Sequence, residues 1–291
     1  MVLGEVYKGS SIDEIVELLG KYKGDAKIIA GGTDIVIALR NEKIAPKALI
    51  DISSIEELEF IKDEGEFIKI GAGVTFTQIV ESPWFQGNLQ GLYKACRLVG
   101  SPQIRNKGTI GGNIANGSPA ADSVPPLICL DSTITLASKA GWRKVFLEDY
   151  YKDKSNYEIK EDELLISIDF KKPTENQVLN FAKLGLRKAL AISRISMATL
   201  LELDEKGQVK TIKIASGSLG KYPMRELEVE DYLMGKSLHN SVMDEAVKVL
   251  QESMDKRLKG RSTLPYKRIA AESMLKESIE DGLKFLDGVR S

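Results

Sequence analysis

The chain has little of the side-chain chemistry with which proteins hold metals or activate nucleophiles. Its 291 residues include two cysteines and one histidine. Cys96 and Cys129 are far apart, which excludes a self-contained iron–sulfur cluster and a paired-cysteine redox site, so we expect both to be buried core thiols. The lone His239 excludes a histidine-rich zinc site, and its neighbours offer no catalytic triad. Redox chemistry on this chain would therefore need a bound organic cofactor.

The sequence also lacks an excess of charge of either sign and a long apolar run. Its 41 Lys and Arg residues nearly balance 42 Asp and Glu residues, so we expect no nucleic acid and no basic membrane surface among its partners. The longest apolar run is too short to cross a bilayer, and residues 1–5 lack the basic start and hydrophobic segment of a secretory signal. We therefore predict no membrane span and a cytoplasmic location. The length predicts two domains at about 150 residues each.

The most informative feature that is present is a glycine-rich stretch, residues 108–122. It runs from Gly108 through Gly111 and Gly112 to a lone carboxylate, Asp122. So many glycines disfavour regular structure, so we predict a loop rather than a helix or a strand. Glycine lets a ligand approach the main chain closely, and consecutive free N–H groups form a concave anion site. The stretch predicts a binding loop for a phosphorylated ligand; a surface Ω-loop is the alternative on composition alone.

A second candidate anion site lies nearer the N-terminus. Residues 27–30 predict a short buried strand and residues 35–40 a helix, with Gly31-Gly32-Thr33-Asp34 between them. Backbone amides and the positive end of a helix would both face an anion here, and Thr33 or Asp34 would cap the helix. A carboxylate would repel a phosphate, so we expect the Asp34 side chain to accept from backbone N–H groups instead. Taken alone, the tetrapeptide fits a plain strand-to-helix turn equally well.

A third glycine pair does not form a nucleotide site. Gly71 and Gly73 follow a predicted strand, but Phe76 occupies the position where a dinucleotide fingerprint has its third glycine. We therefore reject a Rossmann site. Arg105 and Lys107, just before the stretch 108–122, would be able to neutralise phosphate charge, although solvated surface charges are the commoner case.

The rest of the pattern predicts two differently built halves. Before a polar, proline-containing boundary at residues 171–176, we expect helices at 11–23, from 75 or 77 to 80, at 92–99 and at 125–130. We expect strands at 48–52, 57–62, 66–70, 133–137 and 163–170. After the boundary, antiparallel strands at 181–184, 198–203 and 209–215 precede helices at 225–234, 241–254 and 265–286. Strands followed by helices predict an α+β domain whose antiparallel sheet carries helices on one face.

Taken together, these stretches resemble the FAD-binding (medium) subunit of the molybdenum hydroxylases, the xanthine dehydrogenase family that includes the carbon monoxide dehydrogenase flavoprotein. The resemblance is carried by residues 28–35, 100–114, 119–122, 181–184 and 187–193 and extends over nearly the whole chain. It implies an α+β fold: a vanillyl-alcohol-oxidase-type FAD-binding domain at residues 1–172, with subdomains of about 1–55 and 56–172. A flavoprotein C-terminal domain of the carbon monoxide dehydrogenase type would follow at residues 173–291.

The resemblance also implies which residues bind the cofactor. The two glycine segments would hold the FAD diphosphate and adjoining ribityl atoms, Asp122 would contact the flavin, and Lys183 would lie near its ring and stabilise the reduced form. The full set of implied cofactor-binding residues is Ile28, Ile29, Ala30, Gly31, Gly32, Thr33, Asp34, Ile35, Val99, Thr109, Ile110, Gly111, Gly112, Asn113, Asp122, Leu165 and Lys183. No side chain is expected to be catalytic and none to hold a metal, because the chemistry would take place on FAD.

In this family the flavin subunit would be one part of a heterotrimer. The resemblance implies a small partner subunit with [2Fe–2S] clusters and a large partner subunit with molybdopterin. FAD on this chain would collect electrons from the clusters and pass them to NAD or another acceptor. Two alternatives stay open: a self-contained FAD-dependent reductase of the same fold, and a non-catalytic assembly subunit with a vestigial cofactor site.

Overall fold

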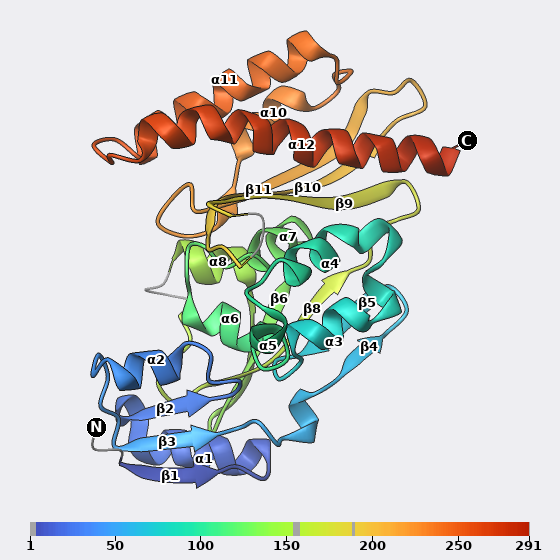
Figure 1. Cartoon of the computed structure of the whole chain (residues 1–291). Coiled ribbons are helices and arrows are strands. Elements are labelled where there is room, and N and C mark those ends of the chain that lie inside the picture. The colour runs from blue at the N-terminus through green and yellow to red at the C-terminus, as the bar shows by residue number, and fades with distance from the viewer. Residues whose placement is uncertain (1–3, 154–157, 188–189, 291) are drawn as a thin grey trace. The chain divides into compact units, whose positions relative to one another are not determined.

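The computed structural model describes residues 4–153, 158–187 and 190–290 (Figure 1). Met1–Leu3 of the N-terminal segment and Lys188 and Ala189 of the segment 187–193 lie outside the described residues. The chain forms two compact units that interleave in the sequence. Unit 1 comprises residues up to 78, 102–117 and 132–171, and unit 2 comprises 79–101, 118–131 and those from 172 onward. The domain boundary at residue 172 stays a prediction.

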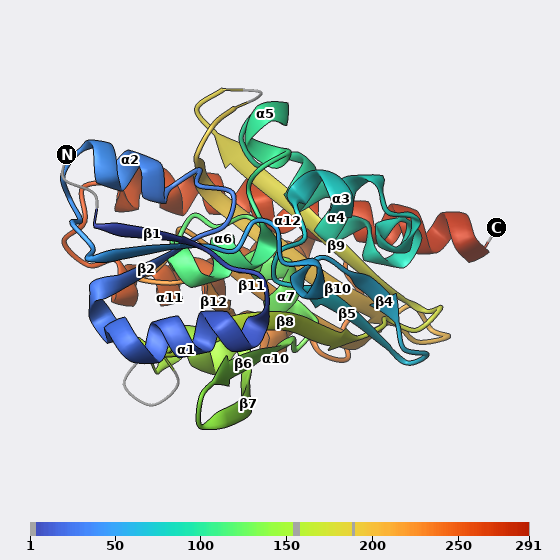
Figure 2. The same cartoon turned by 90° about the horizontal axis from the view of Figure 1, so that it is seen from below.

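Unit 1 begins with a small parallel sheet. Its strand order is β1 (Glu5–Lys8), β3 (Ala48–Asp51) and β2 (Ala26–Ile29). Helix α1 (Ile12–Tyr22) begins at Ser11, whose side chain accepts a hydrogen bond from the amide of Glu14, and α2 (Ile35–Arg40) follows β2. The two helices lie on opposite faces of this sheet (Figures 1 and 2). The carboxyl end of β2 leads directly into the first glycine segment.

The second sheet of unit 1 is antiparallel and has five strands. Their order is β4 (Ile61–Asp63), β5 (Phe67–Gly71), β8 (Leu164–Lys171), β6 (Thr133–Ser138) and β7 (Gly141–Phe146). One hydrophobic core joins α1 and the small sheet to this sheet through Ala137, Leu164 and Ile166. The helices of these segments are α3 (Phe76–Glu81), α5 (Pro102–Arg105), α6 (Ile110–Asn116) and α8 (Leu147–Lys152), and short 3-10 turns lie at Lys23–Asp25 and Glu56–Leu58.

Unit 2 is built on a four-stranded antiparallel sheet. The strand order is β12 (Met224–Arg225), β11 (Val209–Gly217), β10 (Ser193–Leu203) and β9 (Gln177–Gly185). Alternate residues of β10, among them Ile195, Met197 and Leu201, pack against the C-terminal helices in one core. These helices are α10 (Leu227–Leu233), α11 (Asn240–Arg257) and α12 (Leu264–Arg290). The predicted α+β domain with helices on a face of an antiparallel sheet is confirmed.

Two earlier segments of the chain complete unit 2. Helix α4 (Gln90–Arg97) contacts β9, and α7 (Val124–Cys129) contacts β10 and β11, while 3-10 turns lie at Pro83–Phe85 and Gly87–Leu89. The Sγ atom of Cys129 donates to the carbonyl of Ala198 at 3.4 Å, and Gly91 packs on the main chain of Asn180.

Both cysteines are buried and free, as expected of core thiols, and burial raises the pKa of the Cys129 thiol to about 12. No helix of the described chain is long and apolar enough to cross a bilayer.

Candidate functional site

The first glycine segment is a run of unused backbone donors. It connects the end of β2 at Ile29 to the start of α2 at Ile35, and Gly32 takes a positive φ of 73° that glycine adopts without strain. The amides of Val36 and Ala38 donate to the carbonyls of Gly32 and Asp34 within the first turn. The amides of residues 31–35, by contrast, donate to no other group among the described residues. This segment therefore has the free backbone donors that the predicted anion site requires.

The expectation for Asp34 is wrong. Asp34 occupies the N-cap position of α2 with an αR backbone, and its side chain makes no capping hydrogen bond. An effective N-cap has an extended backbone that aims the side chain back at the first amides, and αR geometry turns it away. The carboxylate of Asp34 is instead exposed to solvent. The amides that it would have occupied stay available to a ligand.

The second glycine segment contains a helix, and the prediction of a loop there is wrong. Residues 110–116 form α6, which Thr109 caps by accepting from the amide of Gly112 at 3.0 Å and which ends at left-handed Gly117. A Cβ on Gly111 would lie 2.6 Å from the carbonyl oxygen of Ala72, so glycine lets this helix approach a neighbouring segment closely. Glycine costs a helix about 1 kcal/mol per residue, and tertiary packing here outweighs that preference.

The amides of this second segment are already used inside the protein. Ile110 and Gly111 donate to the carbonyls of Val74 and Ala72 at 2.9 and 3.0 Å, and Asn113 donates to the carbonyl of Thr109 at 3.0 Å. The prediction of consecutive free N–H groups is therefore wrong for residues 110–113. The segment works as a rigid support, while the free donors come from residues 31–35.

The two segments nevertheless lie side by side in unit 1. A Cβ on Gly31 would overlap the carbonyl oxygen of Lys107 and lie 3.0 Å from the amide nitrogen of Gly108. Leu165 belongs to the same neighbourhood, because the next residue, Ile166, accepts from the amide of Ala72 at 2.8 Å. Unit 1 thus brings together the predicted residues 28–35, 109–113 and Leu165.

The remaining predicted residues form a cluster in unit 2. The Nζ atom of Lys183 on β9 lies 2.6 Å from Oδ2 of Asp122, and both side chains are 7% exposed. The same ammonium donates to the carbonyl of Leu98 at 2.9 Å, directly before Val99. Ser193, at the start of β10, donates its hydroxyl to the other carboxylate oxygen of Asp122. Sequence reasoning missed Ser193, although it is the last residue of the segment 187–193.

The pKa of Asp122 depends on its ion pair with Lys183. Burial raises the pKa of Asp122, and the charge and hydrogen bonds of Lys183 and Ser193 act in the opposite direction. A buried carboxylate without a partner would be costly, and the charge and hydrogen bond of Lys183 offset part of that cost. Two of the three ammonium hydrogens are used on Asp122 and Leu98. The third has no partner among the residues that the structure describes.

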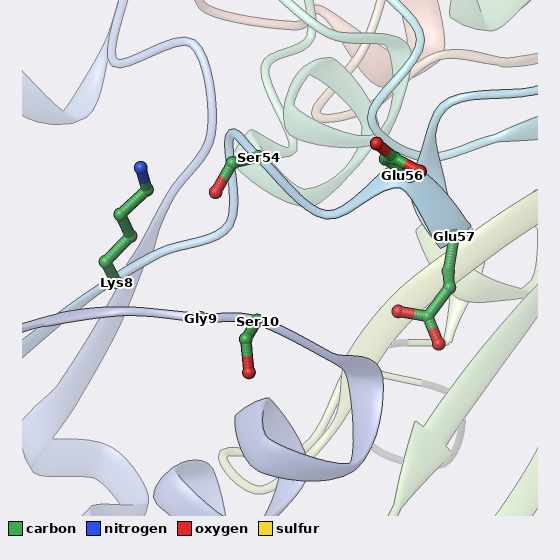
Figure 3. Close-up of a pocket in the computed structure, with 6 residues that line it drawn as sticks. All are labelled: Lys8, Gly9, Ser10, Ser54, Glu56 and Glu57. Carbon is green, nitrogen blue, oxygen red and sulfur yellow. The ribbon is translucent and has the colours of Figure 1, made fainter.

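A separate pocket in unit 1 contains none of the predicted residues. Figure 3 shows its lining side chains, which come from the end of β1 and the segment after β3: Lys8, Gly9, Ser10, Ser54, Glu56 and Glu57. The amide and hydroxyl of Ser10 are occupied by the carboxylate of Glu14, at 2.8 and 2.6 Å. With two glutamates and no free donors at Ser10, this pocket is unsuited to a phosphate.

Comparison with known proteins identifies the family of this chain. The family described as the FAD-binding domain in molybdopterin dehydrogenase matches residues 3–172, and the carbon monoxide dehydrogenase flavoprotein C-terminal domain matches residues 181–281. The chain belongs to this flavoprotein family. The FAD-binding family match includes the free amides of residues 31–35, and the C-terminal match includes Lys183.

Individual relatives agree over nearly their full length. The chain is 34% identical to the nicotinate dehydrogenase FAD-subunit of Eubacterium barkeri, covering 98% of this chain and 97% of that protein. It is 27% identical to the xanthine dehydrogenase FAD-binding subunit of Escherichia coli O157:H7, covering 97% of both. A chain in the structure of carbon monoxide dehydrogenase from Hydrogenophaga pseudoflava matches with a TM-score of 0.90 and 28% identity, over 98% of this chain and 99% of that one. The predicted family and fold class are confirmed, and the chain is the FAD subunit of an oxidoreductase.

Proposed function

We propose that this FAD subunit holds the diphosphate of FAD on the free amides of residues 31–35. Uncharged donors suit a diphosphate, and those of Gly31, Gly32 and Thr33 have no other partner among the described residues. The absence of a side chain on Gly31 lets the segment pack on Lys107 and stay rigid. Lys107, whose main chain lies against Gly31, is an exposed cation. The single observation that carries the proposal is this run of unused amides, which lies within the stretch matched by the FAD-binding family.

The second part of the proposal concerns Asp122 and Lys183. We propose that Lys183 directs its unused N–H at the flavin ring, with Asp122 and the carbonyl of Leu98 fixing the direction of the ammonium. Val99 follows Leu98 and would line the same place. Bound FAD would supply the electron transfer, so the residues of this chain need only bind, orient and tune it.

The third part concerns the electron path. We propose that the subunit works in a heterotrimer with a [2Fe–2S] small subunit and a molybdopterin large subunit, and passes their electrons to NAD or another acceptor. The relatives support this assignment through their names, which describe FAD subunits and medium chains of dehydrogenases. In the described residues no group of three or more Cys, His, Asp or Glu side chains is placed to hold a metal. A partner would therefore have to supply the metal centres.

Two alternatives are less well supported. A self-contained reductase would need a proton donor beside its flavin, and the thiols of Cys96 and Cys129 are buried with raised pKa values. An assembly subunit with a vestigial site would not need to keep the amides of residues 31–35 free or Lys183 paired with a buried Asp122.

The full chain, expressed alone and with its neighbouring genes, tests the proposal. We expect the lone chain to be yellow with one FAD per chain, and to oxidise no purine, nicotinate or aldehyde substrate. The complex purified through a tag on this chain should contain iron and molybdopterin and should turn over a substrate. A colourless chain that takes up no FAD would favour the assembly role, and substrate turnover by the lone chain would favour the self-contained reductase.

A further inference from the structure

A serine with a left-handed backbone joins the two chain segments that carry Asp122 and Ser193. Ser218, the residue after β11, has a φ of 62°, which glycine adopts freely and which strains a residue with a side chain. Its amide donates to the carbonyl of Pro119 at 2.7 Å, and its hydroxyl donates to the carbonyl of Ser193 at 3.1 Å. Ser218 therefore connects the segment that leads to Asp122 with the serine that donates to Asp122.

The hydroxyl is what a serine adds at position 218. The amide bond to Pro119 is a main-chain contact, and so is the carbonyl of Ser218, which accepts from Nζ of Lys267. A glycine would make both contacts without strain. The side chain contributes a hydroxyl that lies 3.1 Å from the carbonyl oxygen of Ser193 and 3.5 Å from that of Pro119. Such strain persists where the surrounding structure holds it, and it is frequent at ligand sites.

Close packing of the main chain at Gly217 supports this connection. A Cβ on Gly217 would overlap the buried hydroxyl of Ser196 and would lie 3.4 Å from the carbonyl oxygen of Pro119. Interiors packed this closely transmit a displacement instead of absorbing it in empty space. A shift of residue 218 would therefore be passed on to the segment that leads to Asp122.

An irregularity of β10 turns Ser193 toward Asp122. The register of β10 against β9 shifts between Ser193 and Ile195, so that Ser193 pairs with Gly185. Gly185 is two residues from Lys183 on β9 and therefore shares its face of the sheet. Without the shift, Ser193 would share the face of Ile195, which packs in the core with the C-terminal helices. The bulge thus places the Ser193 hydroxyl on the side of the ion pair.

We propose that Ser218 is a positioning residue that sets the direction of the Lys183 ammonium toward the flavin ring. This inference rests on the proposed function, because it takes Lys183 as the residue that faces the ring. The Ser218 hydroxyl fixes the main chain of Ser193, whose own hydroxyl donates to one carboxylate oxygen of Asp122. The other carboxylate oxygen lies 2.6 Å from Nζ of Lys183. The interaction of a charge with the ring weakens with distance, so a displaced ammonium would stabilise reduced FAD less.

The test measures the midpoint potential of FAD bound to the full chain together with the stability of that chain. Ser218→Gly removes the hydroxyl and the strain but keeps both main-chain contacts. We expect the free energy of unfolding in urea to stay unchanged or to rise. We expect the midpoint potential to fall by about 30 mV, a roughly ten-fold loss in the preference for reduced over oxidised FAD. A serine with a merely structural role would change stability alone.

Two further variants and a control sharpen the test. Lys23→Gly is the matched control, because Lys23 also has a positive φ, of 48°, but lies at the end of α1 in unit 1. It relieves the same kind of strain and should leave the potential unchanged. Ser193→Ala removes the next hydrogen bond of the chain and should lower the potential at least as much as Ser218→Gly. The double variant should lower it no further than Ser193→Ala alone, because both serines act through Asp122.

The other outcomes separate this inference from the proposed function. An unchanged potential in Ser218→Gly, or additive shifts in the double variant, overturns the positioning role, while one FAD per chain leaves the proposed function intact. Loss of FAD from Ser218→Gly would make the hydroxyl a binding contact and also overturns the inference. A wild-type chain that binds no FAD contradicts the proposed function itself. If Ser193→Ala does not fold, the potential of Ser218→Gly decides alone.

Discussion

Gly31 lies directly against the main chain of Lys107, in such a way that any side chain on Gly31 would overlap the Lys107 carbonyl. Residues 76 positions apart in the sequence are thus held in contact because one of them has no Cβ. One of these segments provides free amides, and the other is fixed by hydrogen bonds within the protein. Separating them would move the proposed donors away from a bound diphosphate.

Gly31→Ala should therefore lose FAD. The added methyl group must displace either residue 31 or the chain at Lys107, at a cost of about 1–3 kcal/mol in unfolding free energy. Flavin absorbance per chain and urea unfolding measure the two effects. Gly20→Ala is the matched control, because Gly20 lies in α1 with nothing within 4 Å of the new methyl. It should raise stability by about 0.5–1 kcal/mol and keep FAD. Full FAD binding by Gly31→Ala would show that the contact between the segments is dispensable.

Lys183→Met should destabilise the protein and change the flavin. Removing one partner of a buried ion pair leaves a buried carboxylate and costs about 3–5 kcal/mol. Loss of positive charge near the ring should also lower the midpoint potential of bound FAD. The double variant Asp122→Asn with Lys183→Met should recover part of the stability. An exposed pair provides the control: Lys139→Met, beside Glu17 at 2.9 Å, should cost at most about 1 kcal/mol. An unchanged potential in Lys183→Met would contradict the proposed place of the ring.

Thr109→Val should weaken the start of α6. The hydroxyl of Thr109 accepts from the amide of Gly112, and loss of an N-cap costs about 0.5–2 kcal/mol. Because α6 follows Gly108, which lies against Gly31 of the proposed FAD-binding segment, we expect faster release of FAD on dilution, measured by flavin fluorescence. Thr109→Ser retains the hydroxyl and should behave like the wild type. If both variants release FAD equally fast, the capping bond is not what supports the segment.

Glu163 should make the free energy of unfolding depend on pH in the acidic range. Burial favours its neutral form, but the hydrogen bonds of Arg143, at 2.6 and 2.7 Å, together with the Lys160 amide and the Arg143 charge, lower the pKa of Glu163 below its ordinary 4.5. A lowered pKa in the folded state means that this stabilisation is complete above pH 4.5 and is lost as the pH falls through the folded value.

Glu163→Gln should therefore flatten the acid limb of unfolding free energy against pH, and should be less stable than the wild type at neutral pH. Asp25→Asn removes an exposed pair with Lys47 at 2.8 Å and should leave the curve unchanged. Identical acid limbs in the wild type and Glu163→Gln would show that this carboxylate contributes nothing to the pH dependence.

The limits of sequence reasoning are clearest at residues 108–117. Composition disfavoured a helix, but α6 forms because Thr109 caps it and Gly111 packs on Ala72, a partner 39 positions earlier. The prediction that Asp34 caps α2 was wrong for a similar reason, because a residue type that often caps helices does not guarantee the backbone geometry that capping needs. Local propensity predicts neither the helix α6 nor the backbone geometry at Asp34, because both depend on contacts with residues that are distant in the sequence.

The sequence alone determined the family, the α+β fold class and the glycine segment at residues 31–34 between a strand and a helix. The fold class and the glycine segment follow from hydrophobic periodicity and glycine placement, which are local properties, and the family follows from the resemblance of whole segments. The tertiary structure alone decided which amides remain free and that Asp122 meets both Lys183 and Ser193. Which amides stay free and which side chains pair depends on the acceptors nearby and on burial, and both are set by contacts between residues far apart in the chain.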